Sequence, residues 1–223
     1  MAETRRHNQP PHPAGGSLCA YCGVALTKSN RTTDHVIPKC LYPASKRTSK
    51  VQRLAVPACK PCNWSFQDDE PHFRDVLKVA GDPSVVIREN WQNARRSFGK
   101  ADGRHRFFDL IEQMKPIDTA DGPQHVVYPG GDEHCMRVIH KIIRGLCYSH
   151  RLPSPVPDQQ VWANVLTYDV PPAFLEALPL HHREADVIEY RYAVLDNDDI
   201  HSAWLLTFFE RARFIGLVWQ PEP

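Results

Sequence analysis

The sequence predicts an α+β fold: a small cysteine-bounded unit of two strands and a helix, then further helices, then one helix with an antiparallel sheet. Three observations support this prediction. Two Cys-x-x-Cys pairs bracket the first unit, residues 132–151 carry apolar side chains at helical spacing, and several short apolar runs follow residue 160. A helix followed by strands that can pair with their neighbours along the chain is typical of the α+β class.

The N-terminal part divides into a tail and a compact unit. Residues 1–17 are polar and rich in Pro and Gly, so we expect a disordered tail. Residues 18–80 contain both Cys-x-x-Cys pairs. Within them, the β-rich stretches 32–37 (TTDHVI) and 49–58 (SKVQRLAVPA) predict two strands, and residues 68–81 predict a helix that ends at a glycine. The order is therefore strand, strand, helix.

The middle of the chain predicts helices and a connection. Residues 81–123 form the expected helical extension and linker. Residues 84–98 and 104–115 have the apolar spacing of two helices, whereas the stretch 115–124, which contains Pro and Gly, predicts a linker. This part would connect the compact unit to the C-terminal domain.

The C-terminal part, residues 124–223, predicts an α+β domain. Residues 132–151 form an amphipathic helix in which Met136, Ile139 and Ile143 recur on one face. The β-like runs that follow are residues 161–168, 186–195, 202–209 and 213–219. The last two are close enough to form a hairpin. The domain contains no phosphate loop or nucleophile motif, so we expect it to serve specificity, a protein partner or a homodimer contact.

Composition indicates a globular chain without a membrane segment. The 223 residues are 42% hydrophobic and 24% charged, which is enough apolar content for a core. No apolar run approaches the ~18 residues that cross a bilayer, and the N-terminus lacks the apolar region of a secretory signal. Seven cysteines, an odd number, argue against a disulfide framework. We therefore expect a cytoplasmic protein in a reducing compartment.

The charge distribution points to a polyanionic partner. The formal net charge is +1, but residues 17–66 contain eight basic residues and a single acidic one, Asp34. Such a basic block suits nucleic acid, and Lys39, Arg47 and Lys60 are the candidate contacts. The alternative, that these side chains only solubilise a loop, stays open on charge alone.

Four of the seven cysteines have the spacing of a metal site. Cys19 and Cys22 form one Cys-x-x-Cys knuckle, and Cys59 and Cys62 form a second one, with 36 residues between the two. Tetrahedral Zn²⁺ needs four soft ligands, and two knuckles supply all four. A redox pair is the alternative for a single knuckle, but two knuckles that flank strands favour zinc. Because a closed four-cysteine site leaves no open position, we expect this zinc to be structural.

The residues between the knuckles resemble a known family. The stretch DHVIP (residues 34–38) lies between the two knuckles, and Asn63 directly follows the last cysteine. This combination resembles the HNH endonuclease family in its zinc-stapled form, over residues 18–66. The resemblance implies a ββα-metal fold, which agrees with the strand–strand–helix order above. Leu54 departs from the family pattern, which usually has an asparagine at that position.

The resemblance also implies a chemistry. His35 would be the general base that activates water, and Asp34 and Asn63 would hold one catalytic divalent cation, Mg²⁺ or Mn²⁺. A neutral imidazole is available as a base near pH 7, and carboxylate and amide oxygens suit a hard cation. Adjacent residues of a regular strand point to opposite faces, so Asp34 and His35 need an irregular strand end to act at one point.

Two functions follow from these observations. The first is a metal-dependent HNH endonuclease that hydrolyses phosphodiester bonds in nucleic acid, with double-stranded DNA as the expected partner. The second is a non-catalytic zinc-finger module that binds nucleic acid or protein and has lost turnover together with the asparagine that Leu54 replaces. A metal-dependent cleavage assay separates the two.

Overall fold

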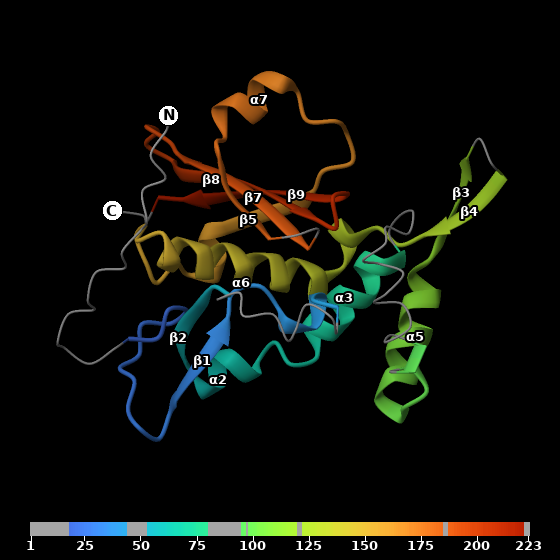
Figure 1. Ribbon diagram of the computed structural model, residues 1–223, viewed down its shortest axis with the longest axis horizontal. Helices are drawn as coiled ribbons and strands as arrows, with labels where there is room; N and C mark the ends of the chain where they lie inside the picture. The colour runs from blue at the N-terminus through green and yellow to red at the C-terminus, as the bar shows by residue number, and fades with distance from the viewer. Residues whose placement is uncertain are drawn as a thin grey trace.

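Helix α6 (Glu133–Ser149) lies between two groups of elements (Figure 1). The computed structural model describes residues 18–43, 53–79, 95–96, 98–119, 122–184 and 187–220. In the view of Figure 1, β1, β2 and α2 of the N-terminal unit lie below α6, α3 lies at its right-hand end, and the C-terminal sheet lies above it. Helices and antiparallel strands are both present, so the predicted α+β class is confirmed.

The N-terminal unit, which we call the finger (the described residues from 18 to 79), contains the two predicted strands. β1 (Arg31–His35) pairs antiparallel with β2 (Ala55–Cys59), and a 3-10 turn, η1 (Lys39–Leu41), follows β1. Residues 49–52 of the second predicted strand lie outside the described residues. Pro57 in β2 has no N–H to donate, but its carbonyl accepts a hydrogen bond from the main chain of the first knuckle at 2.9 Å.

Two helices complete the finger. α2 (Lys60–Trp64) begins directly after β2, and Pro61 stands in its first turn, where a missing N–H breaks no helical bond. α3 (Asp69–Val79) covers most of the predicted helix 68–81, and its first turn is acidic, which the helix dipole favours. The strand–strand–helix prediction for the finger is therefore confirmed.

The middle of the chain contains one of the two predicted helices within the described residues. α5 (Ala101–Gln113) corresponds to the predicted helix 104–115, and it begins and ends slightly earlier than expected. The predicted helix 84–98 lies largely outside the described residues.

The prediction of a linker at residues 115–124 is wrong. These residues belong to an antiparallel hairpin of β3 (Lys115–Thr119) and β4 (Gly122–Val126), which projects from the rest of the molecule (Figure 1). Gly122 has a φ of +104°, a conformation that glycine adopts without strain. Gly122 and Pro123 therefore begin a strand of a hairpin, and they resemble a linker in the sequence because the same residue types occur in both.

A five-stranded antiparallel sheet forms the C-terminal part, in the order β5-β9-β8-β7-β6. The strands are β5 (Val161–Val165), β6 (Leu180–Glu184), β7 (Ile188–Val194), β8 (Ile200–Phe208) and β9 (Ala212–Trp219). All four predicted strands are present, and β8 and β9 form the predicted hairpin. The sequence did not predict β6 or the short helix α7 (Pro172–Ala177), because neither has an apolar period long enough to stand out.

Alternation along β8 divides the apolar side chains between the two faces of the sheet. Trp204, Leu206 and Phe208 belong to the core on the α6 side. Leu205 packs with Leu178 on the other side, which α7 flanks (Figure 1). The sheet is therefore covered on both faces.

α6 joins the finger and the sheet into one hydrophobic core. Phe73 of α3 contacts two rings of the sheet beside α6, with ring centroids 5.3 Å from Phe208 and 5.9 Å from Phe214. A 3-10 turn, η2 (Pro129–Gly131), precedes α6, and another, η3 (Asp158–Gln160), precedes β5. Among the described residues, no helix combines the length and the apolar character that crossing a membrane requires.

α6 approaches β1 closely at Gly145. A Cβ at this position would lie 3.0 Å from both γ-methyl groups of Val36 and 3.3 Å from the hydroxyl of Tyr21. These distances are shorter than an ordinary van der Waals contact between carbon atoms. The glycine therefore lets the helix and the residue after β1 meet.

We expect Gly145→Val to lower the free energy of unfolding by about 1–3 kcal/mol, because the added side chain would press α6 away from Val36. Gly131→Val is the matched control, since a Cβ at Gly131 meets only a carbon atom of Tyr128, at 3.7 Å. Urea unfolding of both variants and of the wild type measures the difference. Equal stability of Gly145→Val and the wild type would show that α6 does not pack tightly on this part of the finger.

Candidate metal centre and active site

The four knuckle cysteines come together at one point. Cys19 and Cys22 stand before β1, Cys59 ends β2 and Cys62 lies in α2, and their sulfur atoms all lie within 4.8 Å of one another. The sulfur atoms of Cys22 and Cys59 are 3.8 Å apart. A tetrahedron of sulfurs around zinc, with bonds of ~2.3 Å, has edges of about 3.8 Å. The cluster therefore has the spacing of a metal centre.

The hydrogen bonds of the knuckles favour a thiolate at this centre. Burial alone raises the pKa of Cys19, but main-chain N–H groups, first that of Cys59 at 3.3 Å, lower it to about 7. Burial raises the pKa of Cys22 and of Cys62. Metal binding at these two sulfurs therefore releases protons, as it does at other thiolate sites.

The donor set of the cluster is compatible with structural zinc. Four sulfurs at tetrahedral spacing take all the positions that this ion uses in a closed site. A metal there would tie the segment before β1 to the junction of β2 and α2. This arrangement agrees with the predicted four-cysteine site.

Asp34, the expected cation ligand, is buried and bound by protein groups. Its carboxylate accepts a hydrogen bond from the Tyr21 hydroxyl at 2.6 Å and contacts Lys141 Nζ at 2.9 and 3.1 Å. Burial, and then the charge of Asp34, raises the pKa of Tyr21, so the hydroxyl remains a donor. Only 5% of Asp34 is exposed. A divalent cation at Asp34 therefore has to share the carboxylate with Lys141 or displace it.

His35, the expected general base, lies at the end of β1. The residue is half-buried, and no described residue hydrogen-bonds its imidazole. Burial, and then the charge of Lys39, lowers the pKa of His35, so the ring is neutral at pH 7. β1 stops at His35 and the next two residues form a bend. The regular strand therefore ends at His35, where we expected an irregular backbone so that Asp34 and His35 could act at one point.

Asn63 lies on the same side of β1 as Asp34. Its Nδ2 donates to the hydroxyl of Thr32 at 3.2 Å. Thr32 and Asp34 are two residues apart in the strand, so their side chains share a face. Among the described residues, none donates a hydrogen bond to the amide oxygen of Asn63. The structure thus brings two of the three expected site residues to one face of β1.

Leu54 replaces the asparagine of the family pattern with an apolar side chain. Its carbonyl accepts a hydrogen bond from Val36 N at 3.0 Å, and its side chain packs against the core. Main-chain pairing beyond the end of β1 therefore holds the segment that follows His35, without an amide side chain.

Two charged residues of this site were not predicted from the sequence. Lys141 of α6 is completely buried and contacts Asp34, the carbonyl of His35 at 3.1 Å, and Glu70 of α3. Burial raises the pKa of Glu70, although Lys141 opposes this effect. The sequence offered no clear signal for Lys141, because at helical spacing it stands opposite Ile139 and Ile143 on the predicted helix.

The basic side chains that we expected to contact nucleic acid are described in part. Lys39 is exposed, and Lys60 is half-buried with its ammonium 5.9 Å from the ring centroid of Trp64. Trp64 is 58% exposed, so this pair presents a cation and an aromatic face at the finger surface. Arg47 lies outside the described residues. Contact with nucleic acid by these side chains stays a prediction.

Another group of ligand-type side chains lies where α3 meets α6. The ligand atoms of His72, Asp132 and Cys135 lie within 4.8 Å of one another, and His72 Nε2 is 2.5 Å from Asp132 Oδ2. Asp132 also caps α6 by accepting from Cys135 N at 2.9 Å. Burial raises the pKa of Cys135, so its thiol stays protonated. We interpret this group as a helix cap held by a histidine.

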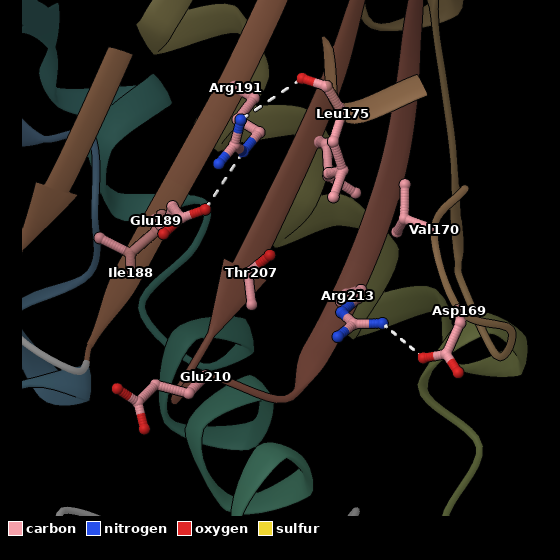
Figure 2. A pocket seen from close by; sticks show the side chains of 10 residues that line it. Asp169, Val170, Leu175, Ile188, Glu189, Arg191, Thr207, Glu210 and Arg213 are labelled. Carbon is pink, nitrogen blue, oxygen red and sulfur yellow. Dashed lines mark hydrogen bonds and ion pairs between the residues drawn. The ribbon is translucent and has the colours of Figure 1, made fainter. Parts of the chain in front are cut away.

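A hollow of about 490 Å³ lies on the α7 face of the sheet, and no finger residue lines it (Figure 2). Its charges are paired: Arg191 donates to Glu189 at 3.2 Å, and Arg213 donates to Asp169 at 3.2 Å. Glu210 adds a further acid. Because acids outnumber arginines, the hollow does not suit a polyanion, and we assign it no part in the site.

Comparison with known proteins gives no match. No family model matches the chain, and neither does any curated protein or any solved structure. The resemblance to HNH endonucleases therefore depends on the motif residues given above, and the family stays a prediction.

We expect the purified protein to contain about one zinc per chain, because the cluster supplies four ligands to one ion. Cys59→Ser should remove the zinc and unfold the finger, since a structural zinc site contributes its binding free energy to folding. Cys40→Ser is the matched control, because Cys40 belongs to the finger but lies outside the cluster. Metal analysis and circular dichroism test this. Unchanged zinc content in Cys59→Ser would refute the four-cysteine site.

An ion pair between α6 and α3 should make stability depend on pH. His134 Nδ1 lies 2.6 Å from Asp69 Oδ1, and this hydrogen bond raises the pKa of His134. A histidine whose pKa is higher in the folded state stabilises the fold. The full effect is present when the pH is below the pKa of the unfolded state, ~6.5, and it is lost as the pH rises through the pKa of the folded state.

We therefore expect His134→Ala to be less stable than the wild type at pH 5.5 but close to it at pH 9. The difference should not exceed about 1 kcal/mol, because the His134 side chain is 57% exposed and solvent screens the pair. Urea unfolding at both pH values tests this, with His105→Ala, an exposed histidine of α5, as the control. The same loss at both pH values would contradict a role for the charged imidazole.

Proposed function

We propose that this protein is a metal-dependent endonuclease of the HNH type that hydrolyses phosphodiester bonds in double-stranded DNA. The observation that carries the proposal is a half-buried, neutral His35 at the irregular end of β1. The other face of this strand carries Asp34, and Asn63 contacts Thr32 on that same face. A four-cysteine cluster with the geometry of a structural zinc site holds the same unit together.

His35 suits the role of the general base. Its pKa lies below the ordinary histidine value, and no described residue competes for the ring nitrogens. A neutral imidazole accepts a proton from water when the two lie within hydrogen-bond reach. In this proposal the imidazole takes the proton of the water that attacks the phosphorus, and the 3′ oxygen leaves.

Asp34 and Asn63 are the residues that would hold the divalent cation. Carboxylate and amide oxygens are the ligands that Mg²⁺ and Mn²⁺ prefer. When bound, such a cation neutralises charge on the phosphate and on the leaving oxygen. Asn63 has an amide oxygen that accepts no hydrogen bond from described residues, whereas Asp34 has to exchange its contact with Lys141.

The surface of the finger supports nucleic acid as the partner, and the cysteines of the chain support a reducing compartment. Lys39 and the Lys60–Trp64 pair offer positive charge and an aromatic face, which bind phosphates and bases. None of the seven cysteines forms a disulfide, which is typical of a reducing compartment such as the cytoplasm.

One observation favours a second function, a non-catalytic zinc-finger module that binds nucleic acid or protein. Tyr21 and Lys141 engage the carboxylate of Asp34, and the whole group is buried. For such a module Asp34 is a structural anion, and only the basic and aromatic surface of the finger has a function.

Cleavage of plasmid and linear double-stranded DNA with Mg²⁺ or Mn²⁺ separates the two functions. We expect the wild type to cut and His35→Ala to cut at least about 100-fold more slowly, because it lacks the base. His105→Ala should cut at the wild-type rate, since this histidine is exposed on α5. Equal cutting by His35→Ala and the wild type would exclude His35 as the base. DNA binding without any cleavage by the wild type would favour the binding module.

A further inference from the structure

The ammonium of Lys141 lies in a cage of oxygen atoms. Its Nζ is 3.1 Å from Asp34 Oδ1, 2.9 Å from Asp34 Oδ2 and 3.1 Å from the carbonyl oxygen of His35, and it also contacts Glu70 Oε1. The cage is assembled from β1 and α3 of the finger, while the cation comes from α6. Three elements therefore converge on one cation.

The cage has two carboxylates, and the single ammonium of Lys141 can neutralise the charge of only one of them. Asp34 and Glu70 are two carboxylates around one ammonium. Arg144, one turn along α6, is directed elsewhere: it donates to the carbonyl of Tyr21 at 2.6 Å and pairs with Asp158 at 3.3 Å. A buried site with an excess carboxylate favours a cation of higher charge.

The oxygen atoms of the cage are also the ligands of a hard metal ion. Mg²⁺ and Ca²⁺ bind carboxylate and main-chain carbonyl oxygens. Magnesium–oxygen distances are ~2.0–2.1 Å, much shorter than the separations around an ammonium, so one centre cannot hold both cations at once.

We propose that this cage is the divalent-cation site of the protein, with Glu70 as a ligand beside Asp34, and that the ammonium of Lys141 competes with the metal for it. This inference rests on the proposed nuclease function because it takes Asp34 as a metal ligand. It places Glu70, rather than Asn63, next to Asp34, since Asn63 contributes no oxygen to the cage. It adds a carboxylate and a resident competitor that the sequence did not indicate.

Glu70 is the most exposed side chain of the cage. The side chain of Glu70 is 23% exposed, whereas those of Asp34 and Lys141 are 7% and 0% exposed. A hydrated cation can therefore meet Glu70 first. The flexible four-carbon stem of a lysine allows its ammonium to withdraw as the metal takes Asp34.

The competition between Lys141 and the metal is tested by titrating the full-length, zinc-loaded chain with Mn²⁺. Calorimetry and electron paramagnetic resonance measure the binding. Lys141→Met should bind Mn²⁺ at least about tenfold more tightly than the wild type, because a like charge no longer occupies the site. Lys78→Met is the matched control: Lys78 is another buried lysine, 3.7 Å from Asp75 on α3, and its loss should leave the affinity unchanged. Unchanged or weaker binding by Lys141→Met would overturn the proposal.

Two further variants locate the ion, and the first of them does not depend on the folding of Lys141→Met. Glu70→Gln keeps the pair of Lys141 with Asp34 and should weaken Mn²⁺ binding about tenfold, since it removes a ligand charge. Lys141→Met combined with Asp34→Asn removes opposite charges together and should lose the added affinity. Unchanged affinity in Glu70→Gln, or retained tight binding in the double variant, would show that the ion binds elsewhere. Mn²⁺ binding is measured without DNA, so failure here and failure to cleave DNA are distinguishable.

Discussion

The ion pair between Lys141 and Asp34 is the interaction on which the arrangement of the site depends. A lysine ammonium is tolerated in a protein interior only where polar or anionic groups surround it. Here those groups come from β1 and α3, while the lysine comes from α6. The position of α6 along the finger is therefore set by charge as well as by apolar contact. The same contact holds the carbonyl of His35, the expected base.

The two ends of the β1–β2 ladder are held by different means. At one end Arg31 faces Cys59, and this cysteine belongs to the four-sulfur cluster. At the other end His35 faces Ala55, and Lys141 binds the backbone there. The four-cysteine cluster and a buried ion pair thus constrain a two-stranded ladder that would be only marginally stable alone. These two constraints explain how so small a unit can hold His35 and Asp34 in fixed positions.

Local spacing was sufficient to predict the parts of the structure that depend on neighbours in the chain. The two knuckles, α6 and the β8–β9 hairpin all follow from residue types a few positions apart. The contact of Lys141 with Asp34 spans 107 residues, and it follows from how α6 packs against the finger. No periodicity in the sequence encodes that packing. The hairpin of β3 and β4 was mistaken for a linker because its Pro and Gly residues are common to both.

A double-mutant cycle of folding stability tests the central claim that Lys141 and Asp34 couple α6 to the finger. The free energy of unfolding is measured for the wild type, Lys141→Met, Asp34→Asn and the double variant. We predict that each single variant loses about 3–5 kcal/mol, because each leaves a buried charge without its partner. The double variant should lose much less than the sum of the two. Additive losses would contradict the account, because they would show that the two residues act independently.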